Sequence, residues 1–418
     1  MSDQTNTQFP ITSEPPQTQP LQVEPISQPQ PNPDIIMTDI NQPEPPLSQQ
    51  ALLKKVFTSY LQEHTVYETI PENMKILVFN SELTIKDSID AMIKEDIYCG
   101  LLWDTTLSKY VGLFTIRDVL SLIRLAYTQC VTYLNKNTNI TSFQSIIDEL
   151  FKLEMPITTT TTTTNPIDTA NQMEIDIDAT KKNAFDAYVK NFSDFFKLFD
   201  SVTINQYIGL YKDKNRKLIS LSLDGNLQES IKLIKENKIH RIVVEDLKSS
   251  TITGFITYEA IFEFFIENYY SDMTEFNMSI KELNIVSKDV ITLDKKETIF
   301  KCMETFYTKR ISLIPIIDKD NNNEIFGYVY LKDIMYFFSN GDKFTFSDPI
   351  EHMLIDIYED IDMEKPLGKE RIVEVNVDTN LKEVLEQMSI CPERKLIVRE
   401  NNDIGIITLS NIFSELME

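Results

Sequence analysis

The stretch Asn237-Lys238-Ile239-His240-Arg241-Ile242-Val243-Val244, followed after a short interval by Gly254-Phe255-Ile256-Thr257, decides the fold of this chain. It has the outline of a helix end, a buried strand with a basic pair at its start, a loop and a second buried strand. Short β-branched runs of this kind are typical of buried strands. The same outline recurs along the chain, and a recurring unit constrains the fold more strongly than any single segment.

Each copy of the repeat is anchored on a glycine. The four glycines are Gly112, Gly254, Gly327 and Gly405. Three residues later stand Thr115, Thr257, Tyr330 and Thr408, and six residues later stand Asp118, Ala260, Asp333 and Asn411. Upstream of each glycine, apolar residues spaced by four and three predict one face of a helix, within 85–92, 227–234, 299–306 and 381–388. Each unit is therefore predicted as strand, helix, strand, strand, helix, and such units must stack to cover their sheets.

The spacing Gly-x-x-Thr-x-x-Asp after such a unit resembles the CBS (cystathionine β-synthase) repeat. Four copies resemble the γ subunits of AMP-activated (SNF1-type) protein kinase. Local likenesses are Lys238-Ile239-His240-Arg241, Leu102-Trp103-Asp104 and the lead-in segment Tyr67-Glu68-Thr69-Ile70-Pro71. The resemblance implies an α/β fold in which four CBS repeats (β-α-β-β-α) pair into two Bateman modules stacked as a disc, with a disordered N-terminal tail.

The repeats occupy only part of the chain. Residues 1–50 hold 11 of the 18 prolines and are rich in Gln, which predicts a disordered tail. The first glycine interval is roughly twice as long as the later two, and the excess contains the threonine run 158–164 within a predicted surface loop, 155–182. An aromatic stripe between 185 and 199 predicts an amphipathic helix that packs in the core. The predicted organisation is 1–50 tail, 51–128 first repeat with its lead-in segment, 129–203 helix, disordered insert and linker, 204–266 second repeat, 284–338 third repeat, and 353–417 fourth repeat.

Composition excludes several classes of function. The chain carries 64 acidic and 40 basic residues, a net charge of −24, so a nucleic-acid partner is not expected. No apolar run approaches the length needed to cross a membrane, and no secretory signal is expected at the start. The four cysteines have no paired spacing and are expected to be reduced, so a cytoplasmic or nuclear location, or both, is predicted.

The resemblance implies that AMP, ADP and ATP bind in clefts between repeats. Such a ligand needs cations for its phosphates, carboxylates for its ribose hydroxyls and apolar walls for its base. The implied nucleotide-binding residues are Asp118 and Asp333 for the ribose, His240, Arg241 and Arg310 for the phosphates, Arg394 and Lys395 as the fourth repeat's basic pair, and Ser312, Thr408 and Ser410 as hydrogen-bond donors.

Structural roles explain some of the same residues. Thr115 with Asp118 has capping-box spacing at a helix start. His240 has the alternative of an interior histidine, and Arg394-Lys395 that of a charged strand edge. Three departures from the family pattern also predict fewer competent nucleotide sites than in a typical γ subunit, or sites of altered selectivity. Tyr98 replaces a basic residue of the family, Glu259 replaces a phosphate-binding lysine, and Asn411 replaces the final aspartate.

No catalytic motif is present: the sequence has no P-loop, no nucleophile elbow and no paired-cysteine metal site. We therefore expect no enzyme and no cofactor or metal, but a regulatory subunit that joins a kinase catalytic α subunit and a β scaffold subunit and responds to adenine nucleotides. The alternative is a diverged CBS-repeat scaffold with degenerate or no nucleotide binding. A third hypothesis, an enzyme or enzyme fragment carrying a CBS module, is disfavoured by the missing motifs.

Overall fold

The computed structural model describes residues 47–71, 73–136, 189–210, 218–248, 251–269, 275–358, 371–400 and 403–418. The predicted tail, except its last four residues, and the threonine-rich insert lie outside this part of the chain. Those last four tail residues include the start of helix α1 (Gln49–Glu63), which Ser48 caps by accepting a hydrogen bond from the Ala51 N–H. Residues 47–418 form one compact unit, and the description below concerns that unit.

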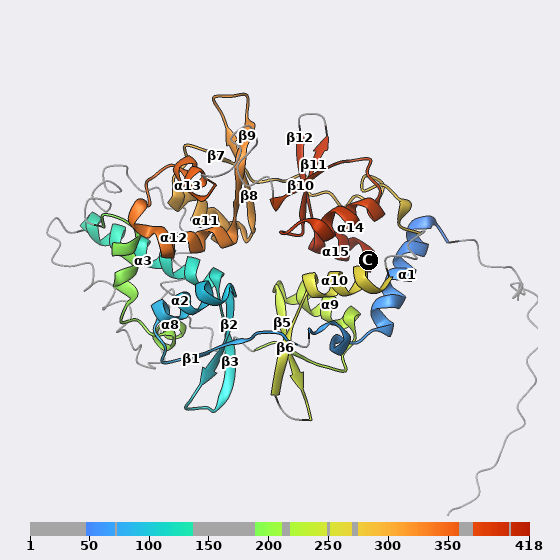
Figure 1. The fold of residues 1–418 in the computed structure, drawn as a ribbon, viewed down its shortest axis with the longest axis horizontal. Coiled ribbons are helices and arrows are strands. Elements are labelled where there is room, and N and C mark those ends of the chain that lie inside the picture. The colour runs from blue at the N-terminus through green and yellow to red at the C-terminus, as the bar shows by residue number, and fades with distance from the viewer. Residues whose placement is uncertain are drawn as a thin grey trace, which may run out of the picture. The chain divides into compact units, whose positions relative to one another are not determined.

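Four three-stranded sheets with the same topology lie within the described residues (Figure 1). In each sheet the first strand pairs parallel with the second, and the second pairs antiparallel with the third. The strands are β1 (Leu77–Asn80), β2 (Cys99–Asp104) and β3 (Lys109–Thr115) in repeat one, β4 (Ser220–Ser222), β5 (Arg241–Asp246) and β6 (Thr251–Thr257) in repeat two, β7 (Leu293–Asp294), β8 (Leu313–Asp318) and β9 (Glu324–Tyr330) in repeat three, and β10 (Val373–Asn376), β11 (Lys395–Glu400) and β12 (Asp403–Thr408) in repeat four.

Each sheet is crossed by a capped amphipathic helix between its first two strands. These helices are α2 (Ile85–Glu95), α9 (Leu227–Asn237), α11 (Ile299–Lys309) and α14 (Leu381–Ile390). Their N-caps are Thr84, Asn226, Thr298 and Asn380, and each cap side chain accepts a hydrogen bond from a backbone N–H three residues on. The closing helices are α3 (Ile116–Lys136), α10 (Tyr258–Tyr269), the 3-10 turn η5 (Leu331–Met335) with α12 (Tyr336–Asn340), and α15 (Leu409–Met417). The predicted order of elements in the repeat is confirmed.

The repeats are joined in pairs because each lead-in segment packs on the other member of its pair. Before α2, the Ile85 N–H donates to Val202 O (2.8 Å), and in return the Ile204 N–H donates to Leu83 O (2.9 Å). Equivalent reciprocal bonds join residues 64–66 to 225–227, 278–280 to 379–381, and 348–350 to 297–299. Two further helices belong to these segments, α8 (Ile204–Leu210) and α13 (Ile350–Ile357). Repeats one and two, and repeats three and four, therefore form the two predicted modules.

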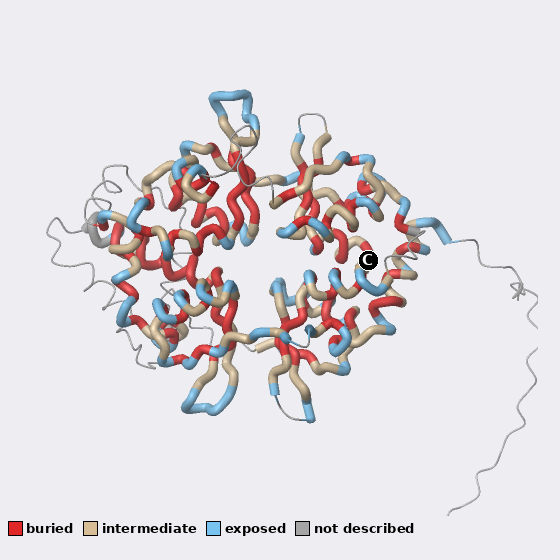
Figure 2. Tube along the Cα trace, viewed as in Figure 1, coloured by how far each residue is buried: buried red, intermediate tan, exposed pale blue. Residues whose placement is uncertain are grey.

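The cores within and between the modules differ in kind. Within a module the sheets meet face to face, as with Cys99 and Leu101 of repeat one against Val243 and Phe255 of repeat two. The corresponding cluster in the other module joins residues of β8 and β9 to β11. Between modules the contact is helical: α3 packs on α11, and α10 packs on α14 and α15 (Figure 1). Figure 2 shows the buried residues along these inner faces and exposed residues at the hairpin tips.

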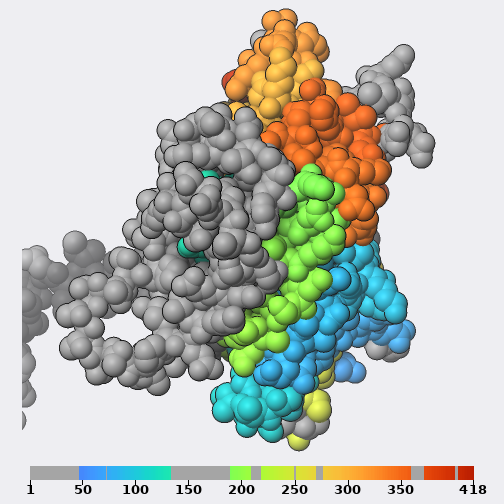
Figure 3. Space-filling model, turned by 90° about the vertical axis from the view of Figure 1, so that its left-hand side faces the viewer, coloured from blue at the N-terminus to red at the C-terminus, as the bar shows by residue number. Residues whose placement is uncertain are grey.

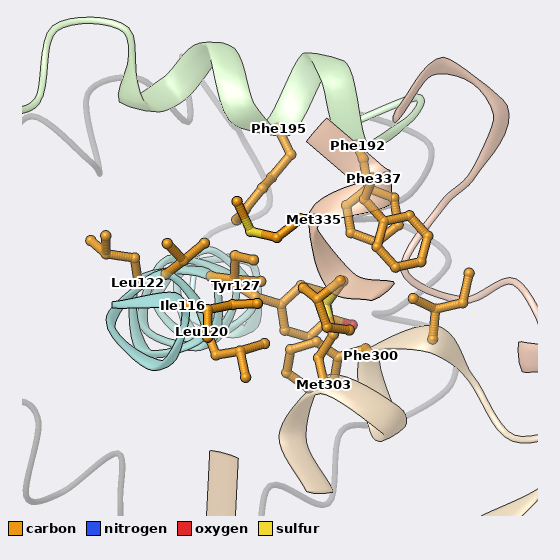
Figure 4. Packing of buried hydrophobic residues seen from close by; sticks show 14 of the residues in the cluster. Ile116, Leu120, Leu122, Tyr127, Phe192, Phe195, Phe300, Met303, Met335 and Phe337 are labelled. Carbon is orange, nitrogen blue, oxygen red and sulfur yellow. The ribbon is translucent and has the colours of Figure 1, made fainter. Parts of the chain in front are cut away.

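The aromatic stripe packs where repeat one meets repeat three. Helix α7 (Phe192–Phe196) and the 3-10 turn η2 (Lys197–Phe199) take up its described part, while residues 185 and 188 lie outside the described ranges. Phe192 stacks on Phe337 with ring centroids 4.6 Å apart, and Tyr127 stacks on Phe300 at 3.9 Å (Figure 4). Figure 3 shows this segment running between the surfaces of repeats three and one. The stripe is a core element, as predicted, although its described helix is short.

A search of the described helices for a span long and apolar enough to cross a membrane finds none. The fold prediction is confirmed for the part of the chain that the structure describes, which forms four β-α-β-β-α repeats in two modules.

Candidate functional site

Strand pairing sets the register between the four repeats. The first residues of the central strands are Cys99, Arg241, Leu313 and Lys395, each opposite the residue three positions after the anchor glycine. Arg241 and Lys395 are therefore equivalent, as the sequence pattern indicated. Arg310 stands earlier, as the left-handed cap of α11 (φ 54°), and corresponds to Lys238 (φ 52°). The strand-start position in repeat three is apolar.

His240 and Arg241 lie in a cationic environment contributed by three repeats. His240 is exposed at its surface, yet desolvation lowers its pKa to about 4, with further lowering by Arg117, Arg241 and Lys395 and opposition from Glu259. The ring is therefore neutral at pH 7, and it has no hydrogen-bond partner among the described residues. The histidine is not the satisfied interior residue of the alternative interpretation.

Arg241 reaches across the first module. Its guanidinium lies close to the Cys99 thiol of repeat one, which is buried. Burial raises the pKa of the Cys99 thiol, and Arg241 opposes that shift. A thiol is a weak partner for a guanidinium, which prefers a planar pair of anionic oxygens. Arg241 consequently keeps donors that a phosphate can accept from.

Arg117 links this environment to repeat three. It belongs to the first turn of α3, and its guanidinium donates to the carbonyl oxygens of Phe306 (3.3 Å), Arg310 (3.1 Å) and Ile311 (3.2 Å). These carbonyls close the C-terminus of α11, where a cation is favourable. Burial and the neighbouring Arg310 lower the pKa of Arg117. Arg117 thus holds the turn that presents the exposed Arg310 side chain.

Asp333 is occupied by the protein itself. Its Oδ2 accepts from the Tyr330 N–H (2.7 Å), and its Oδ1 accepts from Arg371 Nη1 (2.7 Å). Arg371, which precedes β10, also lies over the Tyr330 ring at 3.8 Å and donates to the Tyr358 hydroxyl (2.8 Å). Burial raises the pKa of Asp333, and Arg371 opposes this. A ribose hydroxyl could use Asp333 in the predicted manner only by displacing Arg371.

Lys395 is also engaged. Its ammonium donates to Glu393 O (2.9 Å) and lies 4.0 Å from the Glu393 carboxylate. Burial lowers the pKa of Lys395, against the effect of Glu393 and Glu259. Lys395 lies near two groups of charged residues. Its charge helps to lower the pKa of His240 and also helps to lower the pKa of Glu393.

Several predicted residues have structural contacts. Asp118 caps α3 by accepting from the Thr115 N–H (2.8 Å) and hydroxyl (2.7 Å), and the Tyr207 hydroxyl donates to its other oxygen (3.3 Å). Thr408 forms a capping box with Asn411 at the start of α15. The capping interpretation therefore holds at these positions. It explains why a threonine is followed three residues later by Asp118 in repeat one and by Asn411 in repeat four.

The remaining predicted residues lie apart from the cationic group. Arg394 donates to the carbonyls of Met388 (3.0 Å) and Cys391 (3.3 Å) at the end of α14, and to Glu263 Oε1 (3.1 Å) of repeat two. Burial raises the pKa of Tyr258, and the exposed Ser410 beside it opposes that shift. Ser312 is half-buried, and its carbonyl accepts from the Leu331 N–H (3.0 Å).

Sequence analysis missed four charged residues: Arg117, Lys332, Arg371 and Glu393. The same count from the glycine would have found two of them. Position five after the glycine is Arg117, Glu259, Lys332 and Ser410 in the four repeats, so the basic residue missing from repeat two is present in repeats one and three. Arg371 and Glu393 carry no periodic signal, because they precede strands in the least regular part of the fourth repeat.

The arrangement favours binding of an anionic ligand. The guanidinium groups of Arg117 and Arg241 lie near the neutral His240 imidazole, and Arg310 lies beside Arg117, in a chain whose net charge is −24. Guanidinium and imidazole groups that converge in this way are suited to phosphate oxygens. Among the described residues no group of three His, Cys, Asp or Glu side chains is placed to hold a metal ion.

Comparison with known proteins identifies the repeat. The sequence model of the CBS domain matches residues 213–267, 280–340 and 359–418. These stretches correspond to the second, third and fourth repeats. The first repeat lies outside them but has the same strand order and the same reciprocal lead-in bonds as the others. In structure, the first repeat is a full copy.

Relatives resemble the chain over most of its length. It is 18% identical to the 5'-AMP-activated protein kinase subunit gamma-3 of Bos taurus over 369 residues, 87% of this chain and 60% of the relative. The Homo sapiens subunit gamma-3 is 18% identical over 368 residues, 87% of this chain and 61% of the relative. The chain thus spans about 60% of the length of these curated relatives.

A solved structure has the same fold. The crystal structure of a Methanocaldococcus jannaschii protein, described as a candidate archaeal homologue of the kinase gamma subunit, aligns with a TM-score of 0.51 at 13% identity. The alignment covers 84% of this chain and 99% of the archaeal one. The chain therefore contains CBS domains at residues 213–267, 280–340 and 359–418, and over 87% of its length it is similar to gamma-3 subunits of AMP-activated protein kinase.

Proposed function

We propose that the chain is a non-catalytic, gamma-type regulatory subunit that binds AMP, ADP and ATP between its CBS repeats. One observation carries the proposal: Arg117 of repeat one and Arg241 of repeat two lie close enough to His240 to lower its pKa, and Arg117 donates to the carbonyl of Arg310 in repeat three, all in a strongly acidic chain. The similarity to gamma-3 subunits supports the choice of adenine nucleotides among phosphate-bearing ligands.

The regulatory role follows from differential binding. AMP and ATP differ in phosphate charge, so a cationic site shared by repeats of both modules favours different module arrangements with each ligand. Only such a difference in affinity can shift an equilibrium between two states of a complex. The partners we propose are a kinase catalytic α subunit and a β scaffold subunit, in the cytoplasm, the nucleus or both.

Calorimetric titration of the purified chain with AMP, ADP and ATP tests the binding proposal. We expect micromolar affinity that Arg241→Ala weakens roughly tenfold or more, because a charge-assisted hydrogen bond contributes about 1.5–3 kcal/mol. Arg399→Ala is the matched control, since Arg399 lies near the far end of the same repeat type and pairs with Glu374 (3.3 Å). Equal affinities for the unmodified chain and Arg241→Ala would exclude the assigned site.

Co-purification tests the partner proposal separately. The tagged chain should recover a kinase catalytic subunit and a β subunit from cells, and Arg241→Ala should still recover both, because its defect is in ligand binding. Recovery of neither subunit from cells would refute the gamma-type role.

The scaffold alternative is favoured by one specific observation. Asp118 and Asp333 both serve internal contacts, the first as a helix cap and the second in an ion pair with Arg371. If titration with all three nucleotides gives no heat at millimolar concentration while the tagged chain still recovers its partners, the scaffold function replaces the sensing function.

A further inference from the structure

Glu393 is a partly buried carboxylate surrounded by cations. It lies in the turn between α14 and β11, with its side chain 10% exposed. Its Oε1 is 2.7 Å from Lys332 Nζ and 2.5 Å from Arg371 Nη2, and its Oε2 is 4.0 Å from Lys395 Nζ. Burial alone would raise the pKa of Glu393, but Lys332 and Arg371 hold it below its usual value. The side chain is therefore an anion at neutral pH.

The position is unusual within this chain. Counted back two residues from the start of the central strand, repeats one, two and three have Ile97, Ile239 and Ile311. Only the fourth repeat has a carboxylate there. An isoleucine at this place contributes packing, whereas a carboxylate must be matched by cations to be tolerated in a partly buried environment.

Two of the cations around Glu393 stand at the same repeat positions as two cations near His240 in the first module. Lys332 is the equivalent of Arg117, five residues after the anchor glycine, and Lys395 is the equivalent of Arg241 at the strand start. Glu393 thus contacts Lys332 of the third repeat and Lys395 of the fourth repeat in the way that a phosphate oxygen would. A carboxylate and a phosphate use the same charge-assisted hydrogen bonds from Lys and Arg.

We propose that Glu393 is a resident counter-anion that competes with the phosphate groups of a ligand for Lys332, Arg371 and Lys395, and so sets the anion affinity of the interface between repeats three and four. The inference rests on the proposed function, since it concerns a phosphate-bearing ligand, and it names the residue that determines which repeats bind one. Repeats one and two have no such carboxylate at the equivalent position.

The test is titration of the full chain carrying Glu393→Gln with pyrophosphate and with ATP. Glutamine keeps the shape and hydrogen-bonding capacity of the side chain and removes its charge. We expect affinity for both probes to rise at least tenfold over the unmodified chain, because at an effective dielectric constant of about 20 a unit negative charge within about 10 Å of the phosphates opposes their binding by more than that factor. The rise should be smaller for AMP, which carries less charge.

The matched control is Glu400→Gln. Glu400 ends the strand that Glu393 precedes and also holds two lysines, Lys288 at 3.1 Å and Lys281 at 3.6 Å. Its removal should leave both affinities unchanged. An affinity of Glu393→Gln equal to or weaker than that of the unmodified chain overturns the inference, and so does an equal rise in Glu400→Gln, which would indicate a general effect of net charge.

The outcomes separate this inference from the proposed function. If the unmodified chain binds nucleotides and Glu393→Gln changes nothing, the function stands and the inference fails. If no form binds AMP, ADP or ATP but Glu393→Gln binds pyrophosphate more tightly, the function fails and the counter-anion role stands.

Should Glu393→Gln fail to fold, the unmodified chain crystallised with ATP gives the same answer. A Glu393 carboxylate detached from Arg371, with phosphate in its place, supports the inference. An intact Glu393–Arg371 pair overturns it.

Discussion

Replacing Arg371 with methionine tests the ion pair that occupies Asp333. Asp333 has a side chain 6% exposed, and Arg371 supplies one of its two hydrogen bonds at 2.7 Å. Methionine keeps much of the side-chain volume over the Tyr330 ring but leaves the buried carboxylate with only the Tyr330 N–H. Removing one partner of a buried ion pair costs about 3–5 kcal/mol, because the remaining charge is uncompensated.

The pH dependence makes this expectation specific. Burial already raises the pKa of Asp333, and loss of Arg371 removes the main effect that opposes it. The carboxyl group of the variant can therefore escape the cost by binding a proton. A folded-state pKa above the unfolded value gives stability at low pH that is lost as pH rises through the folded value. The destabilisation by Arg371→Met should be small near pH 4 and reach about 3–4 kcal/mol at pH 7.

Urea unfolding at several pH values measures the effect, with Asp333→Asn and the double variant as controls. In the double variant no charge remains at position 333, and Glu393, the other carboxylate that Arg371 contacts, keeps Lys332 at 2.7 Å, so the double variant should be more stable at pH 7 than Arg371→Met alone. A loss below about 1 kcal/mol at pH 7, or a loss that does not change with pH, would show that the pair does not contribute as the structure indicates.

Three further predictions concern other parts of the fold. Arg117→Ala should lower unfolding stability by about 2–3 kcal/mol through loss of its three carbonyl contacts, and Arg117→Lys should recover only part of it; full recovery by lysine would contradict the forked geometry. His240 has a folded pKa of about 4, below its unfolded value, so the unmodified chain should lose stability relative to His240→Gln as pH falls from about 6.5 to 4; parallel acid-unfolding curves would refute this. Phe192→Ala should cost about 3–5 kcal/mol in urea unfolding, because Phe192 is fully buried against Phe337, whereas Tyr67→Ala, at a residue 69% exposed, should stay within about 0.5 kcal/mol.

Local signals made the repeat predictable from sequence. The glycine anchors, the apolar faces of the crossing helices and the β-branched runs are each set by residues close together in the chain, and each repeat folds with the predicted order of elements. The capping interpretation of Asp118 was available for the same reason, since its Thr115 partner is three residues away. The basic positions Arg117 and Lys332 were also within reach of the glycine count.

Contacts between repeats were beyond sequence reasoning. Arg371 meets Asp333 from 38 residues away, and Arg117 meets the end of α11 from 189 residues away or more. Sequence spacing therefore determined each repeat, its helix caps and the basic residues Arg241 and Lys395 at two of the four strand starts. Only the tertiary structure decided which of those charges are neutralised internally and which remain for a ligand, because electrostatic pairing depends on distance in space, and the modules bring together residues that no local pattern connects.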